Sequence, residues 1–245
     1  VEEPALIRTQ RLLQQLGATC HAQVCDVSSQ AQVQALADAS WSACGQVDWL
    51  FNNAGVAVLG PVWQATSDDW AWVLGVNLMG VVHGVRAFVP RMLEAGAAAH
   101  VINTASAAGL ATLAGSGVYC ASKHAVVAMS ECLQHDLRAA GAPIGVSVLC
   151  PSLLTTGIAD SGRNRPLRWA RTVEPAPAYG ERVRRGMADS PVSAADVATA
   201  TLQAIDRGSF YVLPHGHTWP SVERRMRAIG EDHERGLAAK ENHDE

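Results

Sequence analysis

Short apolar runs alternate with helix-length segments along most of this chain, and this alternation limits the possible folds more than any other feature. Apolar runs typical of strands lie at residues 22–27, 47–51, 100–104, 145–149 and 210–213. Helical patterns lie at residues 5–16, 30–44, 67–95, 118–139 and 194–205. Parallel strands need a crossover of about helix length between them. We therefore predict an α/β fold, a Rossmann-like, doubly wound parallel sheet in a three-layer α/β/α arrangement.

The 245 residues contain neither an internal repeat nor a low-complexity linker, which predicts a single domain over residues 1–245. The periodic pattern breaks over residues 152–191, which are rich in proline and arginine. A long irregular segment in a compact domain often covers a binding site, so we predict a substrate-binding lid there. Residues 222–245 are rich in charge and predict a C-terminal helical tail.

The net charge of −4 argues against nucleic acid as the main partner, and no basic patch suits a membrane surface. We recognise neither a signal peptide nor an apolar run that would span a membrane, so a cytoplasmic protein is expected. The six cysteines form no C-x-x-C pair, and most lie within apolar runs. We expect them to be buried, reduced thiols rather than disulfides or zinc ligands.

Tyr119 and Lys123 stand four residues apart in the helical pattern 118–139, so their side chains share one helix face. An ammonium group near a phenol favours the phenolate and lowers the phenol's pKa from its usual value of about 10. Such a tyrosine can exchange a proton with an alcohol or a carbonyl. The spacing alone is a weak signal, because a Tyr and a Lys on one face often only pack. Lys123, however, is one of only two lysines in a chain that otherwise uses arginine.

Ser106 follows the predicted strand 100–104 and precedes a Gly-rich loop that leads to Tyr119. Its hydroxyl is therefore placed to hold the oxygen of a substrate that exchanges a proton with the tyrosine. Apolar side chains near the predicted mouth of this site favour a partly apolar substrate of moderate size: Leu110, Leu153, Leu154, Trp169 and Tyr179.

Six motifs occur in an order and spacing that resembles the short-chain dehydrogenase/reductase family. They are Asp26-Val27, Asn52-Asn53-Ala54-Gly55, Asn77, Ser106, Tyr119-Cys120-Ala121-Ser122-Lys123 and the segment 151–156. The resemblance implies an oxidoreductase that uses NAD or NADP to interconvert a secondary alcohol and a ketone. It also implies a small-molecule substrate and a homo-oligomer, either a tetramer or a dimer.

The resemblance gives each catalytic position a role. Tyr119 matches the acid/base that exchanges a proton with the substrate oxygen, and Lys123 matches the lysine that lowers the tyrosine's pKa and binds the nicotinamide ribose. Ser106 matches the serine that polarises the carbonyl. Asn77 matches the asparagine that holds a water between the lysine and solvent; taken alone, it would be interpreted as a polar residue tolerated in a buried helix.

The resemblance also implies where the cofactor lies. Asp26 and the Val27 backbone match the contact with the adenine amino group, although a lone Asp at a strand end is more often a helix cap. The turn Asn53-Ala54-Gly55 matches a cofactor-side turn, where small residues let the backbone approach the dinucleotide. Contacts with the nicotinamide side are implied for Pro151, Leu154 and Thr156, and Ser152 stands where the family usually has glycine.

The family's strand, Gly-rich turn and helix that hold the pyrophosphate find no match before Ala5. Since an N-terminal βαβ unit of about 30 residues or more would then be missing, we expect the sequence to be an incomplete view of a longer chain. The alternative is a non-catalytic relative that binds a nucleotide or a partner. The catalytic set of Asn77, Ser106, Tyr119 and Lys123 argues against that alternative.

His215-Gly216-His217 is a second arrangement with chemical potential. Two histidines can ligate a metal, but the neighbouring sequence offers neither an acidic residue nor a cysteine to complete a site. We therefore expect an exposed turn without a metal.

Overall fold

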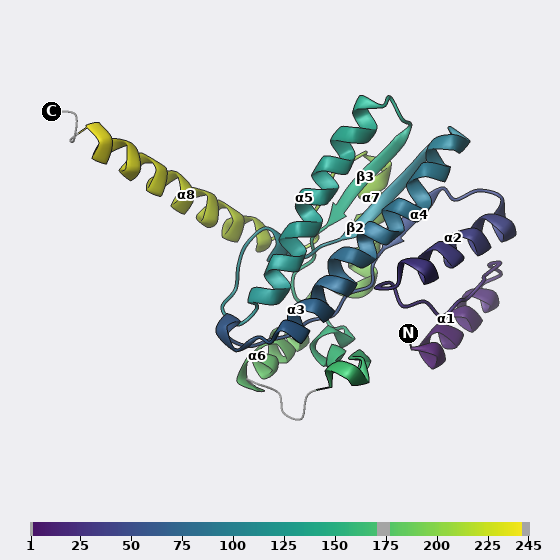
Figure 1. The fold of residues 1–245 in the computed structure, drawn as a ribbon, viewed down its shortest axis with the longest axis horizontal. Coiled ribbons are helices and arrows are strands. Elements are labelled where there is room, and N and C mark those ends of the chain that lie inside the picture. Colours follow the sequence, from purple (N-terminus) through teal and green to yellow (C-terminus); the bar gives the residue numbers. More distant parts are fainter. Residues whose placement is uncertain (1, 171–176, 242–245) are drawn as a thin grey trace.

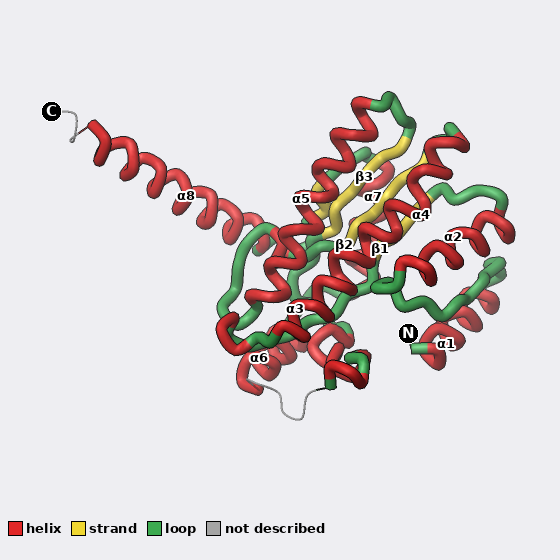
Figure 2. Tube along the Cα trace, viewed as in Figure 1, coloured by secondary structure: helices red, strands yellow, loops and turns green. Residues whose placement is uncertain are grey.

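The computed structural model describes residues 2–170 and 177–241, and its centre is a sheet of four parallel strands. The strands are β1 (Trp49–Asn52), β2 (Ala99–Thr104), β3 (Ile144–Leu149) and β4 (Tyr211–Val212), and they lie side by side in that order. The register places Leu50 beside Val101, and Val101 beside Val146. The predicted Rossmann-like α/β fold with a parallel sheet is confirmed (Figures 1 and 2).

Helices connect the strands and cover them. The described α-helices are α1 (Glu3–Gln15), α2 (Gln30–Cys44), α3 (Ser67–Leu74), α4 (Gly80–Ala95), α5 (Gly117–Ala139), α6 (Pro177–Ala188), α7 (Ala194–Asp206) and α8 (Thr218–Glu241). Short 3-10 segments are η1 (Val62–Gln64), η3 (Ala107–Gly109), η4 (Gly157–Asn164) and η5 (Leu167–Trp169). Polar side chains fix several helix starts, as where Ser29 accepts a hydrogen bond from the Gln32 amide and caps α2.

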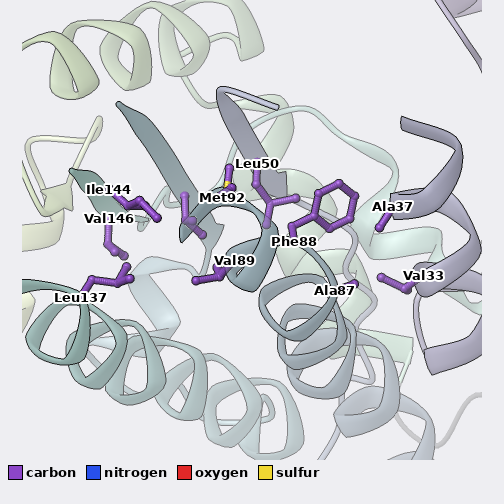
Figure 3. Close-up of a cluster of buried hydrophobic side chains, with 11 residues drawn as sticks. Val33, Ala37, Leu50, Ala87, Phe88, Val89, Met92, Leu137, Ile144 and Val146 are labelled. Carbon is purple, nitrogen blue, oxygen red and sulfur yellow. The ribbon is translucent and has the colours of Figure 1, made fainter. Parts of the chain in front are cut away.

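Two hydrophobic clusters fill the two faces of the sheet, as the alternation of side chains along a strand requires. On one face, Val146 packs with Phe88 and Met92 of α4 and with Leu137 of α5 (Figure 3). Val101 of β2 belongs to the same cluster. On the other face, Ile102 of β2 and Leu149 of β3 pack against Val197 and Ala204 of α7. The layers predicted from the sequence follow from this arrangement.

The predicted strand at residues 22–27 is wrong, because these residues adopt no regular structure in the described part of the chain. A strand exists only where a neighbour pairs with its backbone, and none of the four described strands pairs with this segment. Its apolar residues still contribute to the core, since Cys25 and Val27 pack against the cluster around Phe88.

The predicted long helix at 67–95 is three elements in the structure. A π-turn, η2 (Gly75–Met79), joins α3 to α4 and contains Asn77. One extra residue in a helical turn shifts the side chains that follow, and such turns often occur at functional sites. This π-turn gives Asn77 its direction into the protein.

Residues 67–95 are also long and apolar enough to cross a membrane, judged by length and composition alone. However, 56% of the most apolar stretch is buried inside the protein. The same segment contributes Phe88 and Met92 to the core, which is how the central helix of a globular protein behaves.

All six cysteines are free thiols, as predicted, but they are not uniformly buried. Cys120 and Cys150 are buried, whereas Cys44 and Cys132 are exposed at the surface. The last two lie on the outer faces of α2 and α5, so the prediction of burial is wrong for them.

Substitution of Phe88 provides a test of the hydrophobic core on the α4 side of the sheet. Replacing Phe88, which is buried, by Ala should lower the free energy of unfolding by about 3–5 kcal/mol, because it removes apolar contacts and leaves a cavity. Leu93 on the same helix is exposed and provides the control, and Leu93→Ala should cost less than about 1 kcal/mol. Urea unfolding measures both; equal losses would contradict the placement of this cluster.

Candidate active site

A cavity of about 770 Å³ opens where β2 and β3 end, and it brings together most of the residues singled out in the sequence. Its walls include Asn53, Gly55, Ser106, Tyr119, Lys123, Pro151, Leu154 and Thr156. The remaining predicted residues, Asp26, Val27, Ala54 and Asn77, are not on its wall. Parallel α/β sheets commonly bind ligands beyond the carboxyl ends of their strands, and this cavity lies in that position.

Ser106 is fixed by the backbone around it. Its Oγ accepts a hydrogen bond from the Ala108 amide at 3.1 Å and caps the short helix η3. The same hydroxyl lies 3.3 Å from the Pro151 carbonyl, which follows β3. A further hydrogen bond joins the side chains of Ser106 and Tyr119. The serine therefore holds the tyrosine hydroxyl at the cavity wall, whereas its predicted contact with the oxygen of a substrate stays a prediction.

Lys123 is buried beneath the cavity, one helical turn from Tyr119. Its Nζ donates a 2.7 Å hydrogen bond to the Thr104 carbonyl and lies 5.7 Å from the centre of the Tyr119 ring. Gly55 lies directly against it, since a Cβ at that glycine would stand 3.5 Å from the Lys123 Nζ. The turn after β1 can therefore approach the ammonium closely.

Burial determines the protonation of both groups. It raises the pKa of Tyr119 to about 12, and the Ser106 hydrogen bond opposes this shift. Burial also lowers the pKa of Lys123 to about 8. The prediction that the lysine lowers the tyrosine's pKa below its usual value is wrong for the protein alone. Loss of solvent around the phenol is the largest cause of this shift, and the Lys123 ammonium is itself desolvated and held by Thr104.

Asn77 joins three segments beneath the site. Its Oδ1 accepts a hydrogen bond from the Val56 amide at 2.8 Å, and its Nδ2 donates to the Val56 carbonyl at 3.0 Å and to Ser122 Oγ at 2.9 Å. Asn77 is fully buried, as is Ser122. Sequence reasoning quoted Ser122 as part of a motif without giving it a role, and its position one turn from Tyr119 was the available signal.

Asp26 and Val27 lie outside the cavity. The Asp26 carboxylate accepts hydrogen bonds from the Ser28 amide at 3.0 Å and the Ser28 hydroxyl at 2.7 Å, just before the start of α2. The Val27 carbonyl is paired with His83 Nδ1 at 2.9 Å. These contacts form a local turn that leads into α2, whose N-cap is Ser29, and the adenine contact stays a prediction.

The expectation of an exposed turn at His215 is wrong, because this side chain is buried and holds the loop after β3. Its Nδ1 accepts a hydrogen bond from the Ser152 amide at 3.1 Å, and its Nε2 lies 3.2 Å from the Leu153 carbonyl. An amide can only donate and a carbonyl can only accept, so the ring is neutral and carries its proton on Nε2. His217 is exposed and pairs with Ser152 Oγ at 2.9 Å.

The predicted lid is attached to the body at points that sequence reasoning missed. Ser161 of η4 forms hydrogen bonds with both the amide (2.9 Å) and the carbonyl (3.1 Å) of Ala57. Arg165 forms a 2.6 Å ion pair with Asp69 of α3, with both side chains buried. Such partners lie about a hundred residues apart in sequence, and no local pattern indicates them. Residues 171–176 of the predicted lid lie outside the described residues.

The side chain of Tyr179 on α6 rests over Gly115 in the loop before α5. A Cβ at this glycine would lie 2.0 Å from the ring, and the backbone φ of +75° is one that glycine readily adopts. Gly115 therefore allows α6 to lie close to the cavity wall.

The fold and the site together define a class of protein: a Rossmann-type enzyme domain with a serine, a tyrosine and a lysine at the end of its central strands. Comparison with known proteins agrees with this class. The model of the short chain dehydrogenase family matches residues 2–166. The chain therefore belongs to that family of oxidoreductases, and the sequence-based assignment is confirmed.

Relatives and solved structures extend the comparison. The CLA biosynthesis dehydrogenase/reductase of Lactiplantibacillus plantarum is 30% identical, over 95% of this chain and 83% of its own length. The 1-deoxy-11-beta-hydroxypentalenate dehydrogenase of Streptomyces exfoliatus is 37% identical, over 87% of this chain and 71% of its own length. A short chain dehydrogenase/reductase from Burkholderia phymatum, solved in complex with NAD, is 47% identical with a TM-score of 0.93, covering 95% of this chain and 84% of that one. These matches do not support the expectation of a missing Gly-rich segment, which stays a prediction.

His215 generates a prediction about pH. Burial and the neighbouring His217 lower the pKa of His215 below its usual value of 6.5, so the unfolded chain binds a proton more readily than the folded one. The stability that the neutral ring contributes is present above pH 6.5 and is lost as the pH falls through the lowered pKa. Unfolding by urea at pH 7.5, 6 and 5 should show this loss.

The matched variant is His215→Asn, which keeps one donor and one acceptor but does not titrate. The loss between pH 7.5 and 5 should be smaller in the variant than in the parent. Burial also lowers the pKa of His100, but that residue is present in both proteins and its effect cancels. Parallel pH profiles would show that His215 does not hold the loop in the neutral form.

Proposed function

We propose that this protein is an NAD(P)-dependent oxidoreductase that interconverts a secondary alcohol and a ketone, with Tyr119 as the proton donor or acceptor. The observation that carries the proposal is the meeting of Tyr119, Ser106 and Lys123 at one wall of a largely apolar cavity. The cofactor would supply or accept the hydride, and the chain's own residues would move the proton.

In the direction of ketone reduction, the tyrosine enters the reaction as a neutral phenol. Its pKa of about 12 keeps the proton on the hydroxyl at neutral pH. The Ser106 hydroxyl would hold the substrate oxygen beside that proton, and Tyr119 would donate the proton as negative charge develops on the oxygen. The phenolate that remains would be stabilised by Ser106 and by the nearby ammonium of Lys123.

The donors beneath the cavity fit the ribose and nicotinamide end of a dinucleotide. One N–H bond of Lys123 is used by Thr104, and an ammonium has three, so the lysine can also donate to a ribose hydroxyl. Asn53 and Gly55 form the wall next to it, with the space that a glycine leaves. Pro151, Leu154 and Thr156 would contact the nicotinamide side, as the resemblance implies. The solved relative with bound NAD supports a nicotinamide cofactor, NAD or NADP.

The cavity favours an apolar substrate. Apolar side chains make up much of its wall, among them Leu113, Leu153, Ile158, Met187 and Leu202. Leu153 and Leu154 line it as expected, whereas Leu110, Trp169 and Tyr179 do not reach its wall. The described parts of the predicted lid, residues 152–170 and 177–191, contribute several of these residues and would cover the substrate. The Streptomyces relative is named as a dehydrogenase of a hydroxypentalenate, a substrate that carries a hydroxyl group.

Tyr119→Phe provides the first test. Removing the hydroxyl should lower kcat for alcohol oxidation or ketone reduction by roughly 10²–10⁴-fold, the range typical of a lost acid–base group. The fold should be kept, because phenylalanine fills the same space. Turnover of a panel of apolar secondary alcohols with NAD or NADP, followed by absorbance of the reduced nicotinamide, measures the effect.

Binding of NADH, followed by its fluorescence, is the companion measurement for this variant. The Phe variant should still bind NADH, since phenylalanine keeps the aromatic ring and Lys123 is unchanged. A variant that turns over at the parent rate would rule out Tyr119 as the proton donor. A parent protein that binds neither NADH nor NADPH would favour the non-catalytic alternative.

The pKa of Lys123 predicts how ketone reduction depends on pH. The ammonium stabilises the phenolate only while it is protonated, so kcat/KM should fall as the pH rises through about 8. Lys123→Arg keeps a positive charge at every accessible pH, so whatever activity it retains should not fall in this range. A parent profile that is flat between pH 7 and 10 would contradict this role.

A further inference from the structure

The helix α8 (Thr218–Glu241) extends away from the body of the protein along most of its length (Figure 1). At its start the Thr218 amide donates to the His215 carbonyl, and Arg225 reaches the Leu110 carbonyl at 3.2 Å. These contacts hold the first turns of the helix against the loop after β4 and the segment between η3 and α5. At 24 residues the helix is about 36 Å long, enough for three heptads.

Large apolar side chains lie exposed along one stripe of this helix. Trp219 is 55% exposed, Met226 57% and Ile229 52%, and Leu237 continues the stripe beyond them. From Trp219 through Val222 and Met226 to Ile229 the spacing alternates between three and four residues, which is the pattern of a two-helix seam, and Leu237 follows eight residues further on. A single exposed apolar residue is ordinary, but a stripe of this regularity on a projecting helix indicates a helical partner.

The charges of α8 are divided between its two halves. In the first half, Arg224, Arg225 and Arg227 outweigh Glu223, so the half is basic. In the second half, Glu231, Asp232 and Glu234 outweigh Arg235, so the half is acidic. A second copy of the same helix, running in the opposite direction, would therefore place acidic charge beside basic charge at both ends.

We propose that α8 is a self-association element, which pairs antiparallel with the α8 helix of a second copy of this chain. The pairing is symmetric, so each copy offers the same surface. With the two-fold axis between Met226 and Ile229, Met226 of each copy packs against Ile229 of the other copy. Arg225 and Asp232 lie two turns apart on one side of the seam. In the antiparallel pair, Arg225 of each copy therefore faces Asp232 of the other copy.

A membrane surface fits these observations less well. Helices that lie on anionic lipid carry basic residues along their whole polar face. Here the second half is acidic, and its approach to such a surface would be repelled.

Charge reversal tests the proposal on the complete chain. Reversing the basic half (R224E, R225E, R227E) should weaken self-association about tenfold or more, because like charges then face each other at both ends. Reversing the acidic half (E231R, D232R, E234R) should weaken it similarly. The variant with all six changes has its halves exchanged, and its self-association should return to the parent level. Sedimentation equilibrium over a range of protein concentrations gives the association constants.

The control is the exposed arginine pair of α1, with R8E and R11E, which changes charge elsewhere and should leave association unaffected. Rescue by the six-fold exchange also separates pairing from the loss of the Arg225 contact with Leu110, which the exchange does not restore. The proposal is overturned if the parent is monomeric at all concentrations or if the half reversals change nothing. It is also overturned if the exchange fails to restore association, since α8 would then bind another surface of the second copy.

Discussion

The hydrogen bonds between the Asn77 amide and the Val56 backbone are the constraint on which the active-site side of the molecule depends. They join the turn after β1 to the π-turn between α3 and α4, and the second Asn77 N–H bond fixes α5 through Ser122. These hydrogen bonds thus fix the positions of the three segments relative to one another at the end of the sheet. Because these groups are buried, each lost bond would leave an unpaired polar group, at a cost of about 1–3 kcal/mol. The relative positions of Gly55, Tyr119 and Lys123 follow from this junction.

Burial also sets the electrostatic state of the site. Both the tyrosine and the lysine are moved toward their neutral forms, since a charged group loses more than a neutral one when water is removed. The hydrogen bond from Ser106 acts in the opposite direction on Tyr119. The chain alone therefore keeps the phenol protonated and leaves the ammonium close to its titration point.

Sequence patterns predicted those features of the structure that depend on residues close together in the chain. Hydrophobic periodicity located most strands and helices, and the spacing of Tyr119 and Lys123 placed both beside the cavity. The strand at 22–27 was wrong because pairing depends on a distant neighbour, which no periodicity reveals. The burial of His215 could not be predicted for the same reason, since its partners, Ser152 and Leu153, lie over sixty residues away.

The attachments of the segment after β3 give its two parts different freedom. The part from 157 to 169 is tied to Ala57 by Ser161 and to Asp69 by Arg165, and separating a buried ion pair leaves an uncompensated charge. The α6 helix is held by an exposed ion pair between Arg184 and Asp160, by a hydrogen bond from Thr155 to the Met187 carbonyl and by the contact of the Tyr179 ring with Gly115. An exposed ion pair contributes less than a buried one that would be left uncompensated. Residues 157–169 are therefore held more firmly to the body of the protein than α6 is. We therefore expect substitutions on α6 to alter that side of the cavity while the hydrogen bonds of Ser106 and Lys123 stay as they are.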